Sequence, residues 1–310
     1  MRPEEVMAAR ILKRHRLKPP YDLDELVSNY GDLQYCEFPF SADGVTVGID
    51  GKHKPSVMIN ESISRARQRF TLAHELGHII IPWHIGTFVS HLDADDEYEY
   101  GIMEGEANRF AAELLLPSDW LAEKFSEYEV EDFDEFLADV IADSKASRDA
   151  AFIKIFKTLD APIICAQVEN SEVVRYYKTS TAPYPPFAVG EKIYQHDYFS
   201  SPHKAVEFSH RGNDYWIWIF ETVSVQEVDP RTWREVLVQI LAEVGDSRLL
   251  LSTNATMAAA YQKFKGLDED GVCSGVFRAF ESKDALRGVA SHPLFGQYVI
   301  KRVRELRERG

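Results

Sequence analysis

The spacing of hydrophobic positions changes along the chain. In the first 160 residues most apolar runs have helical spacing and end at proline or glycine, and short β-like runs interrupt them. The predicted helices are residues 3–16 and 22–29, and the β-like runs are 33–38, 44–50 and 56–60. Two helices, a small sheet and then further helices predict a compact α+β domain.

From residue 162 onward, runs rich in β-branched and aromatic residues predict strands, and capped amphipathic runs predict helices. The predicted strands are residues 163–168, 173–178, 188–194, 205–209 and 215–225. The predicted helices are residues 230–243, 253–265, 271–282 and 293–308, the first of them capped by Asp229. The segment YWIWIF, residues 215–220, is aromatic on both faces, which indicates a core strand. This order predicts a second α+β domain.

The predicted helix at residues 67–81, RQRFTLAHELGHIII, contains the pattern H-E-x-x-H. Residues four apart share a helix face, so His74 and His78 can direct two imidazole nitrogens at one zinc ion. Glu75 lies one position on, where its carboxylate can take a proton from a zinc-bound water, as the general base of a zinc peptidase does. The helix is apolar almost all round, and buried ionisable groups need partners, which favours a metal.

A zinc site with two histidines needs a third protein ligand and leaves the fourth position for water. The segment EGEANRFAAELLLP, residues 104–117, predicts a helix ended by proline. Glu104 shares its face with small side chains that allow close packing on the metal helix, namely Ala107, Asn108 and Ala111. Glu104 is therefore the predicted third ligand. Asn108 either orients a ligand or holds the two helices together.

Two other residues remain alternatives for the third ligand. Glu106 lies with Arg109 and Glu113 at helical spacing, which is typical of a solvated charge ladder. His84 lies ten residues after His74, as in metzincins, but that pattern also has a glycine seven residues after the first histidine, where this chain has Ile81.

Two further features bear on how a substrate is held. The run 57–60 is the strand nearest in sequence to the metal helix. At a sheet edge it would pair with an extended peptide, and in the sheet interior it would be structural. Arg67 and Arg69 either bind a substrate carboxylate or hold the acidic segment 93–106. That segment either favours a basic substrate or is a solvated loop. The sequence does not identify the residue that stabilises the oxyanion.

Residues 67–81 and 104–117, together with Met-Ile-Asn at 58–60, resemble the ImmA/IrrE-type metallopeptidases. The resemblance covers roughly the first 125 residues through specific motifs and about 35 more loosely. It implies a zincin-like fold, zinc on His74, His78 and Glu104, and Glu75 as catalytic base. Members are intracellular peptidases, several of which cut a helix-turn-helix repressor and so switch on a mobile element or a stress response.

A length of 310 residues suggests two domains with a small piece between them. Residues 1–127 are predicted to form the zincin-like metallopeptidase domain, and residues 161–310 a C-terminal α+β domain for sensing, docking or dimerisation. Between them, residues 128–160 form a helical linker whose two helices break near Ser144. This linker resembles the helix-turn-helix-like element of the family, but its first half is acidic, which favours packing or docking over DNA reading.

A net charge of −15 argues against a broad DNA-binding surface. No run approaches the about 20 apolar residues that span a bilayer, and the start, MRPEEVMAAR, lacks the apolar stretch of a secretion signal. We therefore expect a cytoplasmic protein that binds neither membrane nor nucleic acid. Cys36, Cys165 and Cys273 are far apart and odd in number, which indicates buried, reduced thiols.

The leading hypothesis is a zinc endopeptidase that cuts a regulatory protein. Many relatives carry their own repressor-like N-terminal domain. Because this chain begins with the peptidase helices, we expect a repressor substrate to be a separate protein. One alternative is a non-proteolytic, partner-binding regulator of a toxin–antitoxin or prophage pair, with a structural or relic zinc site. Another is a DNA-binding regulator that acts through residues 131–159. The oligomeric state stays open.

Overall fold

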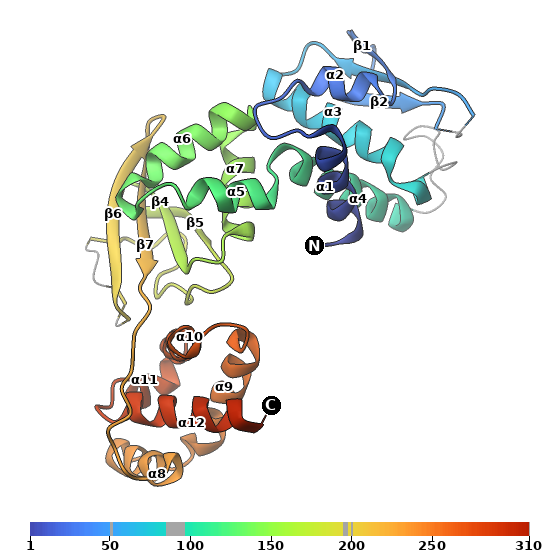
Figure 1. The fold of residues 1–310 in the computed structure, drawn as a ribbon. Helices are drawn as coiled ribbons and strands as arrows, with labels where there is room; N and C mark the ends of the chain where they lie inside the picture. The colour runs from blue at the N-terminus through green and yellow to red at the C-terminus, as the bar shows by residue number, and fades with distance from the viewer. Residues whose placement is uncertain (50–51, 85–96, 195–197, 200, 310) are drawn as a thin grey trace. The chain divides into compact units, whose positions relative to one another are not determined.

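The computed structural model describes residues 1–49, 52–84, 97–194, 198–199 and 201–309 (Figure 1). It divides into two compact units, Met1–Thr158 and Leu159–Gly310. Both contain helices and a sheet, so the expected α+β composition is confirmed. The finer division at residues 127 and 160 stays a prediction. Among the described helices, none is long and apolar enough to cross a membrane.

The first unit opens with two helices and a three-stranded sheet. Helix α1 (Pro3–His15) has its proline in the first turn, and α2 (Leu23–Ser28) is capped by the Asp22 carboxylate, which accepts a hydrogen bond from the Glu25 backbone NH at 3.0 Å. The strands are β1 (Asp32–Cys36), β2 (Gly44–Val47) and β3 (Ser56–Asn60), in the order β1-β3-β2.

Strand β3 is the interior strand of this sheet, parallel to β1 and antiparallel to β2. The hypothesis that residues 57–60 offer a free edge to a peptide is therefore wrong. Val57 and Ile59 are fully buried, as expected of a strand paired on both sides. The edges of the sheet are β1 and β2.

Helix α3 (Arg65–Ile80) carries the H-E-x-x-H pattern and packs on α4 (Glu97–Leu115), with the short turn η1 (Pro82–His84) after α3 (Figure 1). Gly77 allows the close packing. A Cβ there would lie 3.3 Å from Ala107 Cα and 3.1 Å from Phe110 Cδ1. Helix α4 is longer than the predicted helix 104–117. Residues 85–96, including the start of the acidic segment, lie outside the described residues.

After α4 follow α5 (Ser118–Phe125), η2 (Val130–Asp132), α6 (Phe133–Ser144) and α7 (Arg148–Thr158). The predicted break near Ser144 is confirmed, because Lys145 has a left-handed backbone (φ 53°) that ends α6. Phenylalanines on the inner faces of α6 and α7 are buried, namely Phe133, Phe136, Phe152 and Phe156.

Glu113 on α4 is 1% exposed and forms an ion pair with Lys154 on α7, which is 8% exposed. The Glu113 carboxylate also accepts hydrogen bonds from the Ser118 backbone NH (2.9 Å) and hydroxyl (2.7 Å). The predicted solvated ladder is therefore wrong at Glu113. These contacts tie the end of α4 to α5 and α7.

The second unit begins with an antiparallel sheet of β4 (Ile163–Glu169), β5 (Glu172–Lys178), β6 (His203–His210) and β7 (Asn213–Phe220), in the order β5-β4-β7-β6. The predicted strand at 188–194 is wrong. Gly190 (φ 90°) turns the backbone there, and the contact with the sheet is one bridge, Glu172 to Lys192. The prediction for YWIWIF is confirmed, because Tyr215 and Trp218 are buried.

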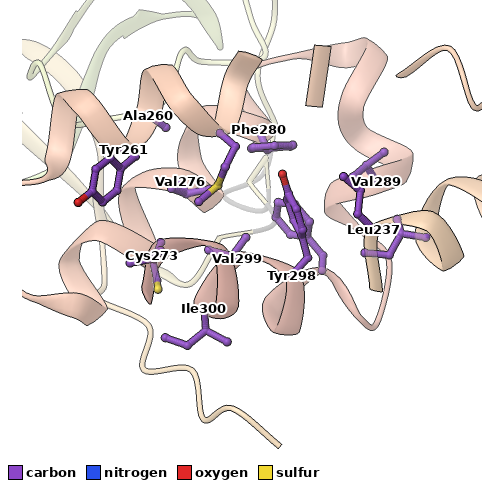
Figure 2. Close-up of a cluster of buried hydrophobic side chains, with 14 of the residues drawn as sticks. Leu237, Ala260, Tyr261, Cys273, Val276, Phe280, Val289, Tyr298, Val299 and Ile300 are labelled. Atoms are coloured by element: carbon purple, nitrogen blue, oxygen red, sulfur yellow. The ribbon is translucent and has the colours of Figure 1, made fainter. Parts of the chain in front are cut away.

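The rest of this unit is helical: α8 (Trp233–Val244), α9 (Leu249–Phe264), α10 (Glu269–Glu281), η3 (Asp284–Leu286), α11 (Arg287–Ala290) and α12 (Phe295–Arg309). Figure 2 shows their core, in which Val276 and Phe280 of α10 lie near Tyr298 and Val299 of α12. The predicted cap of α8 is wrong. Thr232 caps the helix, and Asp229 binds Arg231 instead.

Candidate metal centre

The structure brings together the three predicted metal ligands. His74 and His78 lie one turn apart on α3, and Glu104 faces them from α4. The Nε2 atoms of the two histidines are 3.0 Å apart. The Glu104 carboxylate oxygens lie 3.2 Å from His74 Nε2 and 3.4 Å from His78 Nε2. One donor atom from each residue lies within 4.8 Å of the others, so the three can hold one ion.

The charges in this cluster depend on one another. Burial raises the pKa of Glu104, but hydrogen bonds and charge interactions with His74 and His78 outweigh it and hold that pKa well below its ordinary range. Burial lowers the pKa of His74, while Glu104 and Glu75 raise it above its ordinary value. An ionised carboxylate thus lies against two imidazoles. Two nitrogens and one carboxylate form a donor set that fits zinc and leaves a position for water.

Glu75 points to the sheet side of α3, next to strand β2. Its side chain is nearly buried, and its Oε2 accepts a hydrogen bond from the Thr46 hydroxyl at 2.6 Å. Strand β2 comes so close that a Cβ on Gly44 would lie 3.1 Å from Glu75 Oε1. Sequence analysis did not identify Thr46. Its one signal was alternation, because Thr46 is the middle residue of V-T-V and faces opposite to the two valines.

His84 and Glu106, the two alternative ligands, do not join the converging group. The turn that begins at Pro82 places His84 against His78, with 3.0 Å between their Nδ1 atoms, and His84 is fully buried. On its other side His84 Nε2 lies 3.0 Å from Glu106 Oε2. Trp83 Nε1 donates to the same oxygen at 2.6 Å. Glu106 is thus held by neighbours rather than solvated, which corrects the expected ladder at this residue too.

The remaining candidates are also placed. Asn108 Oδ1 lies 3.0 Å from His74 Nδ1, so this side chain orients His74, one of the two predicted possibilities. Arg67 forms an ion pair with Asp43. Arg69 donates to the backbone carbonyls of Ser144 (2.9 Å) and Tyr21 (3.3 Å), so it holds the fold around α3. These contacts do not place either arginine against the group of His74, His78 and Glu104.

Within the described part of the chain, His74, His78 and Glu104 are the one group of three or more His, Cys, Asp or Glu residues whose ligand atoms are close enough together to hold a metal ion. The three cysteines are free thiols. Cys165 and Cys273 are buried as predicted, whereas Cys36 is only half-buried.

One family of known proteins matches part of the chain. Residues 36–146 match the Peptidase_M78 family, described as an IrrE N-terminal-like domain. This stretch contains all three residues of the candidate centre and Glu75, so the similarity to a metallopeptidase family falls on the candidate centre. The resemblance to the ImmA/IrrE-type metallopeptidases is thereby confirmed.

Two relatives are similar to this chain over part of its length. Immunity region protein 2 of Bacillus phage phi105 is 28% identical over 123 residues, which cover 39% of this chain and 72% of that protein. The radiation response metalloprotease IrrE of Deinococcus deserti is 34% identical over 90 residues. That alignment covers 25% of this chain and 31% of the IrrE protein.

Among solved structures, a Mycobacterium tuberculosis transcriptional regulator aligns with a TM-score of 0.44 and 15% identity. The alignment covers 71% of this chain and 88% of that one. At this level of similarity it supports no argument about function.

Proposed function

We propose that this protein is a zinc-dependent endopeptidase that hydrolyses a peptide bond in a regulatory protein. The observation that carries the proposal is the convergence of His74, His78 and Glu104 beside a nearly buried Glu75 on the same helix. A structural zinc site closes its fourth position with another protein ligand, whereas a catalytic site keeps that position for water. The described group has three members, which favours the catalytic kind.

Bound zinc would act as a Lewis acid that polarises the scissile carbonyl and acidifies water at this site. The proton transfers are carried out by a residue of the chain. Glu75 takes the proton from the attacking water and delivers it to the leaving amine. The Thr46 hydroxyl fixes one oxygen of the Glu75 carboxylate, which leaves the other to face the reaction. Strand β2 is the sheet edge beside Glu75, so we expect an extended substrate to pair there rather than on β3.

We further propose that the substrate is a separately encoded, helix-turn-helix repressor-like protein, and that cleavage takes place in the cytoplasm. The similarity to a phage immunity region protein and to a radiation response metalloprotease supports a role in prophage or stress regulation. The second unit would choose or gate the substrate.

The variant Glu75→Gln tests the enzyme. It keeps the size of the side chain and the acceptor for Thr46 but cannot take up a proton. We expect it to bind one zinc per chain, measured by elemental analysis, and to leave proteins of neighbouring genes uncut in mass spectrometry. The surface variant Glu127→Gln is the matched control and should cut at the rate of the unmodified protein.

The same variant separates the rival hypotheses. If Glu75→Gln keeps the biological effect of the unmodified protein, the chain acts as a partner-binding regulator and the endopeptidase proposal fails. A DNA-binding role of residues 131–159 would instead appear as a retarded duplex band at low salt in a gel-shift assay.

A further inference from the structure

The alternative ligands His84 and Glu106 form a line of contacts behind His78 that the proposed reaction does not use. It runs from His78 Nδ1 to His84 Nδ1 (3.0 Å), and from His84 Nε2 to Glu106 Oε2 (3.0 Å). Trp83 Nε1 donates to that same oxygen at 2.6 Å. His84 is fully buried and the Glu106 side chain is 17% exposed, so bulk water does not replace these contacts.

With a metal on His78 Nε2, the chemistry of the end group fixes the direction of every hydrogen bond in this line. An ionised carboxylate can only accept, so His84 Nε2 must carry the hydrogen that it donates to Glu106. A neutral imidazole that donates through Nε2 accepts through Nδ1, so His78 Nδ1 must in turn donate to His84. His78 Nε2 can then give its lone pair to the metal, and Nε2 is the atom that faces Glu104 and His74.

His74 follows the same rule by a shorter route. Its Nδ1 lies 3.0 Å from the amide oxygen of Asn108, which can only accept. With a metal bound, His74 Nε2 therefore also gives its lone pair to the ion. Different partners orient the Nε2 atoms of the two histidines toward a metal. An amide does so for His74, and a second histidine with a carboxylate does so for His78.

We infer that His84 and Glu106 are positioning residues that lock His78 in its Nδ1–H tautomer and direct its Nε2 lone pair at the metal. This inference rests on the proposed zinc site and adds to it the residues that prepare one ligand. Outer partners of metal-bound histidines typically change metal affinity by about 10- to 100-fold when removed. Because the buried His84 lies between them, the charge of Glu106 is one imidazole ring further from His78 than a carboxylate that bound His78 directly would be.

Zinc affinity of the full chain, measured by competition with a chromogenic chelator, tests the inference. His84→Leu fills a similar volume without an acceptor and should weaken zinc binding by about 10- to 100-fold. His84→Asn keeps an oxygen near the position of Nδ1 and should recover most of the loss. Glu106→Gln keeps an acceptor for His84 but loses the charge, and should give a smaller loss than His84→Leu.

The matched control lies in the second unit. His292 pairs with the Glu243 carboxylate at 2.9 Å and its side chain is 9% exposed, so His292→Asn breaks a similar pair away from the metal ligands. This control should bind zinc like the unmodified protein. If His84→Leu binds zinc within about twofold of the control, a purely structural role for His84 is the better account and the inference is overturned.

Nitrogen-15 NMR of the histidine rings of the zinc-loaded protein gives a second readout. We expect zinc on His78 Nε2 and a slowly exchanging hydrogen on His78 Nδ1 in the unmodified protein, and a faster exchange of that hydrogen with water in His84→Leu. Zinc on His78 Nδ1, or a Nδ1 hydrogen that exchanges as fast in the unmodified protein as in His84→Leu, would overturn the inference even if zinc binds. Conversely, a chain that shows the Nδ1–H tautomer but cuts no substrate would refute the proposed function and leave the inference intact.

Discussion

Replacing Lys154 by methionine removes the cation from a buried ion pair and should destabilise the first unit. The Glu113 carboxylate is 1% exposed, and without Lys154 its remaining partners are the backbone NH and the hydroxyl of Ser118. Leaving one charge of a buried pair unpaired typically costs about 3–5 kcal/mol. Because these two hydrogen bonds still stabilise the carboxylate, we expect a loss of about 3 kcal/mol for Lys154→Met, at the low end of that range.

Removing the other partner of the pair, by Glu113→Leu, should lower the free energy of unfolding more. It leaves the ammonium of Lys154 buried with the Ser118 hydroxyl at 3.1 Å as its remaining contact, so we expect about 4–5 kcal/mol. Combining Glu113→Leu with Lys154→Met removes both charges and should restore most of the stability. The loss in the free energy of unfolding of the double variant should therefore be well below the sum of the losses of the two single variants.

Hydrogen exchange followed by mass spectrometry suits a chain with two units, because it reports the free energy of opening peptide by peptide. Peptides from α4 and α7 should lose protection, and peptides from α9 and α10 serve as internal reference. The exposed pair of Lys18 and Glu123, with side chains 67% and 58% exposed, is the matched control, and Lys18→Met should cost at most about 1 kcal/mol. A loss below about 1 kcal/mol for Lys154→Met, or strictly additive losses in the double variant, would refute the reasoning.

Three further predictions follow from individual contacts. Thr46→Val should cost about 1.5–3 kcal/mol, because the buried Glu75 carboxylate loses a charge-assisted hydrogen bond; thermal unfolding checks this, with Thr46→Ser close to the unmodified protein. Gly77→Ala should be destabilising by about 1–3 kcal/mol and should weaken zinc binding, since its methyl group would press on Phe110 and the α4 backbone; a more stable variant would contradict this. A thiol reagent should label Cys36 alone in the native protein and all three cysteines after unfolding, and rapid labelling of a second native thiol would disprove the buried placement of the other two.

Helical spacing predicted much of the candidate site. Four residues separate His74 from His78, and that spacing alone places both rings on one face. The preference for Glu104 over Glu106 came from its small-residue face, and the structure has Glu104 against the two imidazoles. These are arguments within one helix or between two helices that pack through small residues, so they need little knowledge of the rest of the fold. The catalytic and ligand roles themselves stay predictions until zinc and cleavage are measured.

The sequence could not predict contacts between segments far apart in the chain. Glu106 and Glu113 have the spacing of a solvent-exposed ladder. However, Glu106 is half-buried and pairs with His84, and Glu113 is buried and pairs with Lys154. The spacing rule assumes that this face of the helix is exposed to water, but tertiary packing determines whether it is exposed. The hydrogen bond between Thr46 and Glu75 joins residues 29 positions apart, so no local rule finds it.

Strand errors had similar causes. The composition of residues 56–60 indicates a strand but not its neighbours, and pairing on both sides made it interior. Residues 188–194 have β-like composition, but the positive φ at Gly190 turns the chain away from a ladder. Both cases show that strand identity depends on partners that lie elsewhere in the chain.

Helix α4 meets a different neighbour at nearly every turn. Along its length Glu104 faces the two histidines of α3, Glu106 faces His84, Arg109 pairs with Glu4 of α1, and Glu113 pairs with Lys154 of α7. A single-residue insertion inside this stretch would rotate everything beyond it by about 100°, so no two of these partnerships on either side of the insertion would survive together. The spacing between residues 104 and 113 is therefore fixed by four separate contacts, and an insertion scan should find this stretch of α4 far less tolerant than the turn at residues 126–128.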